Sequence, residues 1–426
     1  MTEKHASVAG EVVLKPGKEK SLRRRHPWVY DTAVARVGGK PAPGATVAVR
    51  GADGSWLAWA AYSPQSTLRA RCWSFVENDT IDRDWFAARV QAAVARRAHL
   101  AGASDALRLV FGEADQLPGL IADRYGRQLV VQFQAAGVEA QRDLLLDALV
   151  AASGCVNVYD RSDSTTRQRE GLPATQGVAR GAEPPELIRV REKVHEDALD
   201  FLVDVRRGHK TGFYIDQRDN RALAGALTRQ LARELGRAPR VLNCFSYTGG
   251  FSLAALIGGA GVVLSIDSSA DALELARSNC GNSGKNGGKD NGDSSVGARG
   301  AALEWQQADV FDALRELQRA EREFDLIVLD PPKFAASHHH VDRAARAYKD
   351  INMNALRLLA QGGALMTFSC SGAIDSDLFQ KIVAGAVIDA RVHVQMRRRL
   401  AAGEDHPLLM THPEGEYLKG LLLVRV

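Results

Sequence analysis

From about residue 195 onward, apolar runs of strand length alternate with segments that have helical spacing. This alternation is typical of strand–helix–strand units, in which parallel strands form one sheet with helices on both faces. It constrains the fold strongly, because few other architectures repeat strand and helix in turn. We therefore predict a doubly wound α/β domain over 195–426. Its mainly parallel, seven-stranded sheet is expected at 240–245, 262–267, 303–308, 325–330, 363–369, 391–397 and 418–425.

Two smaller parts are expected before this domain. Residues 1–80 contain short runs that alternate apolar and polar residues between Gly, Pro and Asp, which predicts a small barrel-like β domain. Residues 81–194 mix helical and strand patterns, which predicts an α+β linker domain. Within it, the polar run 162–186 is interpreted as a surface excursion. The Gly-, Asn- and Ser-rich segment 280–300 is interpreted as a flexible insertion in the last domain.

Bulk properties exclude several classes of protein. No apolar run is long enough to span a bilayer, and the first residues lack the apolar core of a signal peptide. The five cysteines show no paired spacing that suggests zinc or a disulfide framework. The adjacent histidines 338–340 cannot easily point at one ion, so no metal is predicted. These features favour a cytoplasmic protein whose thiols are reduced.

A glycine turn follows the first strand of the sheet, in VLNCFSYTGGFSLAAL (241–256). Gly249 and Gly250 would let the backbone turn tightly and approach a ligand. Asp267 ends the next strand, where a carboxylate can accept both ribose hydroxyls of a nucleoside. The motif is not G-x-G-x-x-G, so a nucleoside without a pyrophosphate fits better than a dinucleotide. The alternative is a strand-to-helix turn with no ligand.

Other acidic residues follow neighbouring strands. Asp309 comes just after the third strand, where it could accept from an adenine amino group. Asp330, Pro331 and Pro332 follow the fourth strand in FDLIVLDPPKF. Ligands of open α/β sheets bind at the carboxyl ends of the strands, so these segments are expected to meet at one crevice.

Cys370 ends the fifth strand in GGALMTFSCSG (362–372), and a helix is expected a few residues later. The N-terminus of that helix would favour a thiolate. Such a thiolate can add to carbon 6 of a pyrimidine, making the otherwise inert carbon 5 nucleophilic enough to accept a methyl group. The alternative is an inert buried thiol.

Basic residues gather near the N-terminus, although the net charge of the chain is only +4. Cations beside an aromatic ring suit a surface that contacts phosphates and stacked bases, so we predict an RNA-binding site there. The alternative is a solvated loop. The residues predicted to bind RNA in this cluster are Lys20, Arg23, Arg24, Arg25 and Trp28.

Six segments in this order resemble the bacterial large-subunit ribosomal RNA cytosine-5 methyltransferases, over almost the whole chain: SLRRRHPWVY, GFYIDQRDNR, NCFSYTGGFSLAA, DPPKF, TFSCSG and DHP…EGEYLKG. The resemblance implies a PUA domain, a linker domain and a Rossmann-like methyltransferase domain. It implies 5-methylcytosine formation in 23S ribosomal RNA, with S-adenosyl-L-methionine as cofactor. The 280–300 insertion departs from the family pattern.

The resemblance also implies roles for single residues. Cys370 would be the nucleophile, and Asp330 would hold the edge of the cytosine. Phe213, Gln217, Asp267 and Asp309 would serve the cofactor. Apart from the resemblance, we predict that Asn243, Tyr247 and Gly249 also bind the cofactor and that Lys333 contacts RNA. Whether the protein forms a homodimer, and what the 405–416 loop does, stay open.

Two rival functions remain at this point. An amino-directed RNA methyltransferase would use DPPKF to grip an exocyclic amine and would not need Cys370. A ribosome assembly factor would hold the cofactor without turnover and rely on its N-terminal domain.

Overall fold

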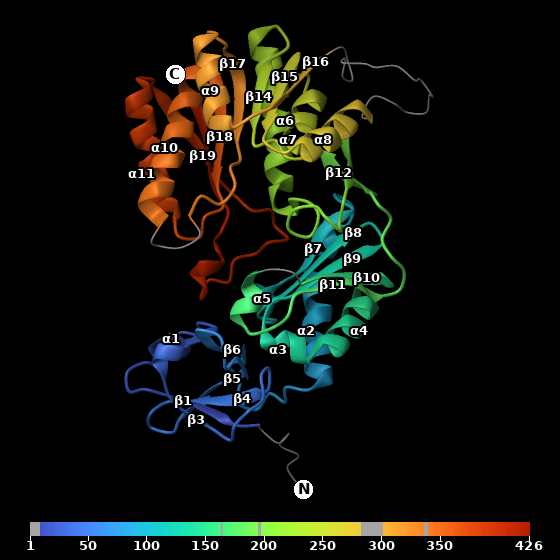
Figure 1. Cartoon of the computed structure of the whole chain (residues 1–426), viewed down its shortest axis with the longest axis vertical. Helices are drawn as coiled ribbons and strands as arrows, with labels where there is room; N and C mark the ends of the chain where they lie inside the picture. The colour runs from blue at the N-terminus through green and yellow to red at the C-terminus, as the bar shows by residue number, and fades with distance from the viewer. Residues whose placement is uncertain (1–8, 163–164, 195–196, 283–300, 336–339) are drawn as a thin grey trace. The chain divides into compact units, whose positions relative to one another are not determined.

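The computed structural model describes residues 9–162, 165–194, 197–282, 301–335 and 340–426. The chain falls into two compact units, each assembled from separate segments. Unit 1 consists of residues 1–190, 203–215 and 404–415, and unit 2 consists of residues 191–202, 216–403 and 416–426. Figure 1 follows the chain from the N-terminal strands to the C-terminal sheet. No helix among the described residues is long and apolar enough to cross a membrane.

The first part of unit 1 is a six-stranded sheet in the order β2-β6-β5-β4-β1-β3. Its pairs are antiparallel except for β1 with β4. Alternate side chains of the strands form its apolar core, which includes Val12, Val29 and Val47. A small β domain was therefore predicted correctly. Its elements are β1 (Glu11–Leu14), α1 (Lys20–Arg23), β2 (Trp28–Tyr30), β3 (Val34–Gly38), β4 (Thr46–Arg50), β5 (Trp56–Tyr62) and β6 (Leu68–Ser74).

The second part of unit 1 is a five-stranded sheet in the order β11-β10-β9-β8-β7, with α2 and α4 packed together. Asp82 caps α2 by accepting from the Trp85 backbone amide. The strands are β7 (Ala106–Phe111), β8 (Leu120–Tyr125), β9 (Gln128–Phe133), β10 (Asn157–Ser162) and β11 (Thr175–Arg180). The helices are α2 (Arg83–Arg96), α3 (Ala136–Ala140), α4 (Arg142–Ser153) and α5 (Thr165–Arg169).

The interpretation of 162–186 as a surface excursion was wrong. This segment contributes α5 and the edge strand β11, and it buries Arg167 and Glu170. Glu170 accepts hydrogen bonds from Ser63 Oγ and Arg71 Nη1, both at 2.8 Å. Polar residues can enter a core when they are paired in this way, and a hydrophobicity pattern does not reveal such pairing.

Unit 2 contains a seven-stranded sheet in the order β16-β15-β14-β17-β18-β20-β19. Strands β14 to β18 run parallel, and β20 lies antiparallel between β18 and β19. The strands are β14 (Arg240–Cys244), β15 (Val262–Asp267), β16 (Ala302–Gln307), β17 (Phe324–Leu329), β18 (Leu359–Ser369), β19 (Val394–Ala401) and β20 (Lys419–Arg425).

Helices of unit 2 pack in two groups, α6 with α7 and α8, and α9 with α10 and α11. The strand order reverses between β14 and β17, which is the place where doubly wound sheets bind ligands. The helices are α6 (Arg218–Leu235), α7 (Gly250–Ile257), α8 (Ala270–Asn282), α9 (Val310–Arg319), α10 (Val341–Leu358) and α11 (Ser376–Ala390). A two-stranded ribbon, β12 (Ile188–Val194) with β13 (Asp197–Val203), precedes α6.

The predicted α/β sheet is confirmed in the number of strands, their mainly parallel direction and their approximate positions in the chain. The sixth strand begins at Val394 instead of residue 391, because α11 continues to Ala390 and Arg391 then takes a left-handed conformation with φ 58°. The predicted flexible insertion lies outside the described residues from 283 to 300. The division into domains at 80/81 and 194/195 stays a prediction.

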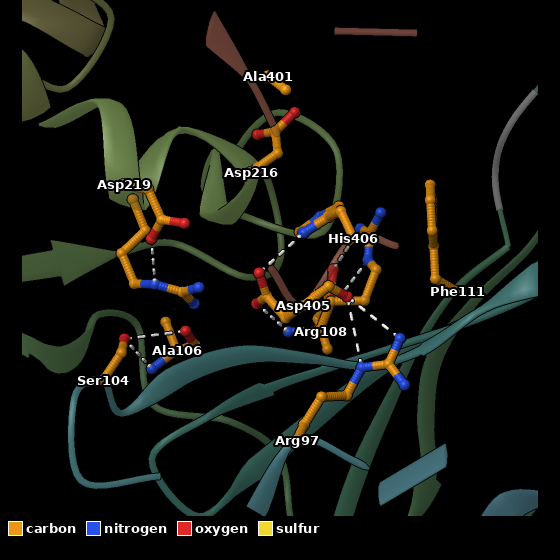
Figure 2. Close-up of polar contacts among 12 residues, drawn as sticks. Arg97, Ser104, Ala106, Arg108, Phe111, Asp216, Asp219, Ala401, Asp405 and His406 are labelled. Carbon is orange, nitrogen blue, oxygen red and sulfur yellow. Dashed lines mark hydrogen bonds and ion pairs between the residues drawn. The ribbon is translucent and has the colours of Figure 1, made fainter. Parts of the chain in front are cut away.

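Residues 404–415, here called the crossover segment, join β19 to β20 but pack within unit 1. Asp405 is fully buried there, and its Oδ2 accepts from the Arg108 backbone amide at 2.9 Å. Arg97 donates to the Asp405 carbonyl oxygen at 3.2 and 3.3 Å, as Figure 2 shows. The DHP motif therefore has a structural function: it fixes the crossover segment to the five-stranded sheet.

Candidate active site

The turn after β14 is tight and conformationally strained. Phe245 and Tyr247 both have positive φ values, 59° and 46°, which residues with a side chain rarely adopt. Gly249 has φ 78°, and a Cβ atom there would lie 3.0 Å from the Ala276 Cβ. Glycine is thus required at Gly249 by conformation and by space. Strain of this kind is concentrated at ligand sites, which supports the predicted binding turn.

Asp267, at the end of β15, shapes the same turn. Its Oδ2 accepts from the Tyr247 amide at 2.8 Å, and its Oδ1 accepts from the Ser269 amide at 2.9 Å. A carboxylate can accept about four hydrogen bonds, so two acceptor positions are left for ribose hydroxyls. Asp267 can therefore orient the turn and bind a nucleoside at the same time.

Several buried polar atoms around this turn have no hydrogen-bond partner among the described residues. Asn243 donates to Ser252 Oγ at 2.8 Å, which leaves its Oδ1 unpaired. The others in the turn are Ser246 Oγ and Thr248 Oγ1, and Gln217 Nε2, before α6, is unpaired as well. Unpaired buried polar groups are costly, and a polar ligand bound beside them would remove that cost. The residues present therefore fit a nucleoside-type cofactor.

Three further residues predicted to bind the cofactor are found in different settings. Gln217 ends a short 3-10 helix directly before α6 in unit 2, and its Oε1 accepts from Asn220 Nδ2 at 2.6 Å. Asp309 is exposed and caps α9, accepting from the amides of Phe311 and Asp312. Phe213 is buried and belongs to unit 1, whereas the other predicted cofactor residues belong to unit 2. The role of each in cofactor binding stays a prediction.

Cys370 and Asp330 follow the adjacent parallel strands β18 and β17. Cys370 Sγ lies 3.7 Å from the Pro331 carbonyl oxygen, which places the thiol against the D-P-P segment. Cys370 is partly exposed, whereas the other four cysteines of the chain are buried. Burial raises the pKa of the Cys72 and Cys280 thiols to about 12, and raises that of Cys244 strongly as well. Cys370 is therefore the cysteine suited to act as a nucleophile.

Tyr348 of α10 fixes both residues that flank Cys370. The Ser369 hydroxyl donates to Tyr348 Oη at 3.0 Å, and Tyr348 Oη lies 3.0 Å from Ser371 Oγ. The Ala335 amide in turn donates to Ser371 Oγ at 3.2 Å. Tyr348 is fully buried, and burial raises the pKa of its phenol, so it remains a neutral partner. These contacts connect the loop carrying Cys370 to the segment that carries Asp330.

The predicted contribution of the helix after Cys370 needs a correction. Helix α11 begins at Ser376, and the carboxylate of Asp375 already caps it by accepting from the Leu378 amide at 2.7 Å. A negative charge at the helix N-terminus offsets the partial positive charge that was expected to favour a thiolate. A thiolate at Cys370 would therefore need another source of positive charge.

The N-terminal basic residues are exposed, as an RNA-binding surface requires. Lys20, Arg23, Arg24 and Arg25 lie on α1 or directly after it. Trp28 is different, because it is half-buried, its Nε1 donates to Glu113 Oε1 at 2.8 Å, and its ring packs 4.4 Å from that of His412. A stacking role for Trp28 would require its ring to remain accessible on one face.

Lys333 is exposed and lies in unit 2, whereas the N-terminal cluster lies in unit 1. Within the described part of the chain, no cluster of three His, Cys, Asp or Glu side chains could hold a metal ion. His338 and His339 lie outside the described residues. The sequence did not reveal the contacts of Tyr348 and Asp405, although Asp405 lies in the DHP…EGEYLKG motif.

Comparison with protein families gives two matches. Residues 12–75 match a PUA-like domain, and residues 181–406 match an S-adenosylmethionine-dependent methyltransferase family. Among curated proteins, the chain is 46% identical over 411 residues to "Ribosomal RNA large subunit methyltransferase I" of Erwinia tasmaniensis, covering 96% of this chain and 98% of the relative. The proteins of the same name from Cronobacter sakazakii and Escherichia coli are 46% and 45% identical over the same length.

Solved structures agree in fold. A Streptococcus mutans chain described as a SAM-dependent methyltransferase superposes with a TM-score of 0.77 at 19% identity, covering 97% of this chain and 99% of that chain. A methyltransferase complexed with SAH superposes with a TM-score of 0.79 at the same identity and coverage. At this identity the likeness supports the architecture alone.

Proposed function

The chain belongs to the family of ribosomal RNA large subunit methyltransferase I, and on that premise we propose that it methylates carbon 5 of a cytosine in 23S ribosomal RNA. The observation that carries this proposal is the position of Cys370. It is the partly exposed cysteine at the carboxyl end of β18, and its sulfur lies against the D-P-P segment that begins at Asp330. Carbon 5 of cytosine is too inert to be methylated without such a nucleophile.

We propose that the strained turn after β14 holds S-adenosylmethionine. Asp267 would accept from the ribose hydroxyls, and the unpaired atoms of Asn243, Ser246 and Thr248 would face polar groups of the ligand. When bound, S-adenosylmethionine supplies an electrophilic methyl group. The roles of Gln217, Asp309, Tyr247 and Phe213 toward the same ligand belong to this proposal.

In the proposed reaction, Cys370 Sγ as a thiolate forms a bond to carbon 6 of the cytosine. The electron pair of the 5,6 double bond then makes carbon 5 nucleophilic toward the methyl group. After methylation, carbon 5 loses its proton to water, the electron pair of that C–H bond re-forms the 5,6 double bond, and Sγ leaves as a thiolate. Asp330 would hold the cytosine edge and stabilise the charge that develops on the ring after attack.

The amino-directed rival would use the same D-P-P segment but would need no thiol beside it. The contacts that Tyr348 makes with Ser369 and Ser371 hold the cysteine loop against that segment, which favours the carbon-directed reaction. A non-catalytic assembly factor would not need a partly exposed thiol at the carboxyl end of β18.

The proposed partner is large-subunit ribosomal RNA, contacted by the PUA-like domain and by Lys333. A cytoplasmic location is proposed with it, and whether two copies associate stays open. The direct test is transfer of a radiolabelled methyl group to ribosomal RNA from cells that lack the gene. Mapping should locate the label at carbon 5 of a 23S cytosine, whereas label on an exocyclic amine would support the rival.

Replacing Asp267 with alanine should weaken S-adenosylmethionine binding by about 1–3 kcal/mol, the cost of losing charge-assisted hydrogen bonds. Asp267→Asn should lie between alanine and the wild type, because it keeps one acceptor oxygen. Asp271→Ala, which removes an exposed carboxylate at the start of α8, is the matched control and should bind normally. Calorimetry that gave unchanged affinity for both Asp267 variants would exclude the ribose role.

Reversing the charge of Arg23, Arg24 and Arg25 to glutamate should weaken RNA binding most at low salt. Each lost phosphate contact should reduce the slope of log affinity against log salt by about 0.7–0.9. The control reverses three exposed arginines elsewhere in unit 1, Arg36, Arg83 and Arg127, and so has the same net charge. Filter binding across salt concentrations measures both. Equal losses in the two triple variants would show that only net charge matters.

A further inference from the structure

Lys419 is a buried lysine directly beside the loop that carries Cys370. It is the first residue of β20, only 4% exposed, and its Cα pairs with that of Ser369 in the antiparallel register. Its Nζ donates to the carbonyl oxygens of Ser371 at 2.9 Å and Ile374 at 2.6 Å. The ammonium group is therefore held underneath the turn that follows the proposed nucleophile.

This ammonium has no ion-pair partner among the described carboxylates, since none lies within 4.0 Å of Nζ. Buried lysines are rare and are usually paired with an opposite charge, because removing a cation from water is costly. Two carbonyl dipoles offset part of this cost. A nearby anion of another kind would offset the rest.

Cys370 is in range to supply that anion. Burial lowers the pKa of Lys419, while the charges of Glu416, Cys370 and Asp375 raise it and that of Lys333 lowers it. These groups come from four segments: the one before β20, the loop after β18, the cap of α11 and the loop after β17. Glu416 is itself engaged by Ser376 Oγ at 3.0 Å, and Asp375 caps α11. Of these groups, the thiol belongs to the residue directly before Ser371, whose carbonyl oxygen the amine contacts.

We propose that Lys419 is a positioning residue that keeps Cys370 in its thiolate form and holds the 371–374 turn in place. The inference rests on the proposed function and deepens it, because it names the charge that activates the nucleophile. The thiol proton passes to solvent, and Lys419 remains protonated throughout. The same ammonium stabilises the sulfur again when it leaves carbon 6. This supplies the positive charge that the capped N-terminus of α11 does not.

Alkylation of Cys370 by iodoacetamide tests the proposal without RNA or methyl transfer. The other four cysteines are buried, so mass spectrometry of the Cys370 peptide gives its rate at each pH. In the wild type the rate should reach half its maximum below pH 8.5, the ordinary value for a cysteine thiol. Lys419→Met should shift that midpoint upward by about one pH unit or more, which is a tenfold lower rate near neutral pH. Lys419→Arg should restore the wild-type midpoint.

Lys419→Gln separates charge from structure, because it is neutral but can still donate to a backbone carbonyl. The proposal expects the glutamine variant to fold, with a circular dichroism melt like the wild type, and to show the raised midpoint. A wild-type midpoint in the glutamine or methionine variant would overturn the proposal and leave only a structural role. If neither variant folded, the wild-type profile would still decide, since a midpoint at or above 8.5 would contradict an activating cation.

The role of Lys419 and the proposed function can be refuted separately. A normal covalent adduct with RNA together with an unshifted alkylation profile would refute the role of Lys419 alone. A shifted profile with no methyl transfer to cytosine would support the activated thiol and refute the proposed substrate.

Discussion

Cys370→Ala is expected to reduce methyl transfer by about a thousandfold or more, while S-adenosylmethionine binding and the melting temperature stay close to those of the wild type. The sulfur activates the base and is not needed to hold either ligand, so its loss should appear in kcat. The partly exposed position of Cys370 means that little packing is lost when Sγ is removed. Single-turnover assays with labelled cofactor and ribosomal RNA measure the effect.

Cys244→Ala is the matched control, because it removes a thiol at the end of the neighbouring strand β14. That thiol is fully buried in the core of unit 2, and burial raises its pKa, so it has no part in the chemistry. The control should lose some stability and keep its activity. Undiminished turnover in Cys370→Ala would eliminate the covalent route and support the amino-directed rival.

Arg97→Met is expected to destabilise unit 1 by about 3–5 kcal/mol, the usual cost of breaking a buried ion pair from one side. Arg97 is 3% exposed and donates to both oxygens of Asp115, which is fully buried. It also donates to the Asp405 carbonyl oxygen, and so connects α2 to the crossover segment. The substitution would leave Asp115 with less compensation and that carbonyl without its donor.

Arg96→Met provides a matched control on the same helix and the same carboxylate. Arg96 Nη2 lies 2.7 Å from Asp115 Oδ1, but the Arg96 side chain is 53% exposed. Exposed ion pairs contribute about 0–1 kcal/mol, so this variant should be nearly neutral. Hydrogen exchange of β7 and β8 peptides in increasing denaturant gives the unfolding free energy of unit 1. Equal losses in both variants would show that burial does not decide the strength of this network.

The α/β sheet was predictable because its strands are buried on both faces. Strand β17, for example, is buried at every residue, and such a run between helices has few other interpretations. The edge strand β11 was missed because it is polar and only partly buried. Its place depends on β10 and on the buried pairs of Arg167 and Glu170, which are tertiary contacts that no local pattern encodes.

Several residues of the candidate site could be predicted because of the sheet topology. Cys370 and Asp330 directly follow strands, Asp267 ends one, and topology alone brings the ends of neighbouring parallel strands together. Tyr348 and Lys419 could not be found in this way. A tyrosine within a helix and a lysine at the start of a strand are usually surface or packing residues, and only the register of β18 with β20 shows that Lys419 faces the cysteine loop.

Asp405 illustrates a third limit. Its motif is part of the family resemblance, but the sequence left the role of the 405–416 loop open. In the structure it is buried in unit 1, where the Arg108 amide and His406 Nδ1 contact its two carboxylate oxygens. A return of the chain to an earlier unit leaves no periodic signal, because it depends on a few specific hydrogen bonds.

The covalent mechanism is tested most directly by RNA that carries 5-fluorocytosine in place of cytosine. Fluorine cannot leave carbon 5 as a proton does, so the bond between Sγ and carbon 6 should persist after methylation. We expect a protein–RNA adduct that survives denaturation, requires S-adenosylmethionine, is absent in Cys370→Ala, and maps by mass spectrometry to the Cys370 peptide. Methylation of ordinary RNA without any adduct on the fluorinated RNA, or an adduct that persists in Cys370→Ala, would contradict the account.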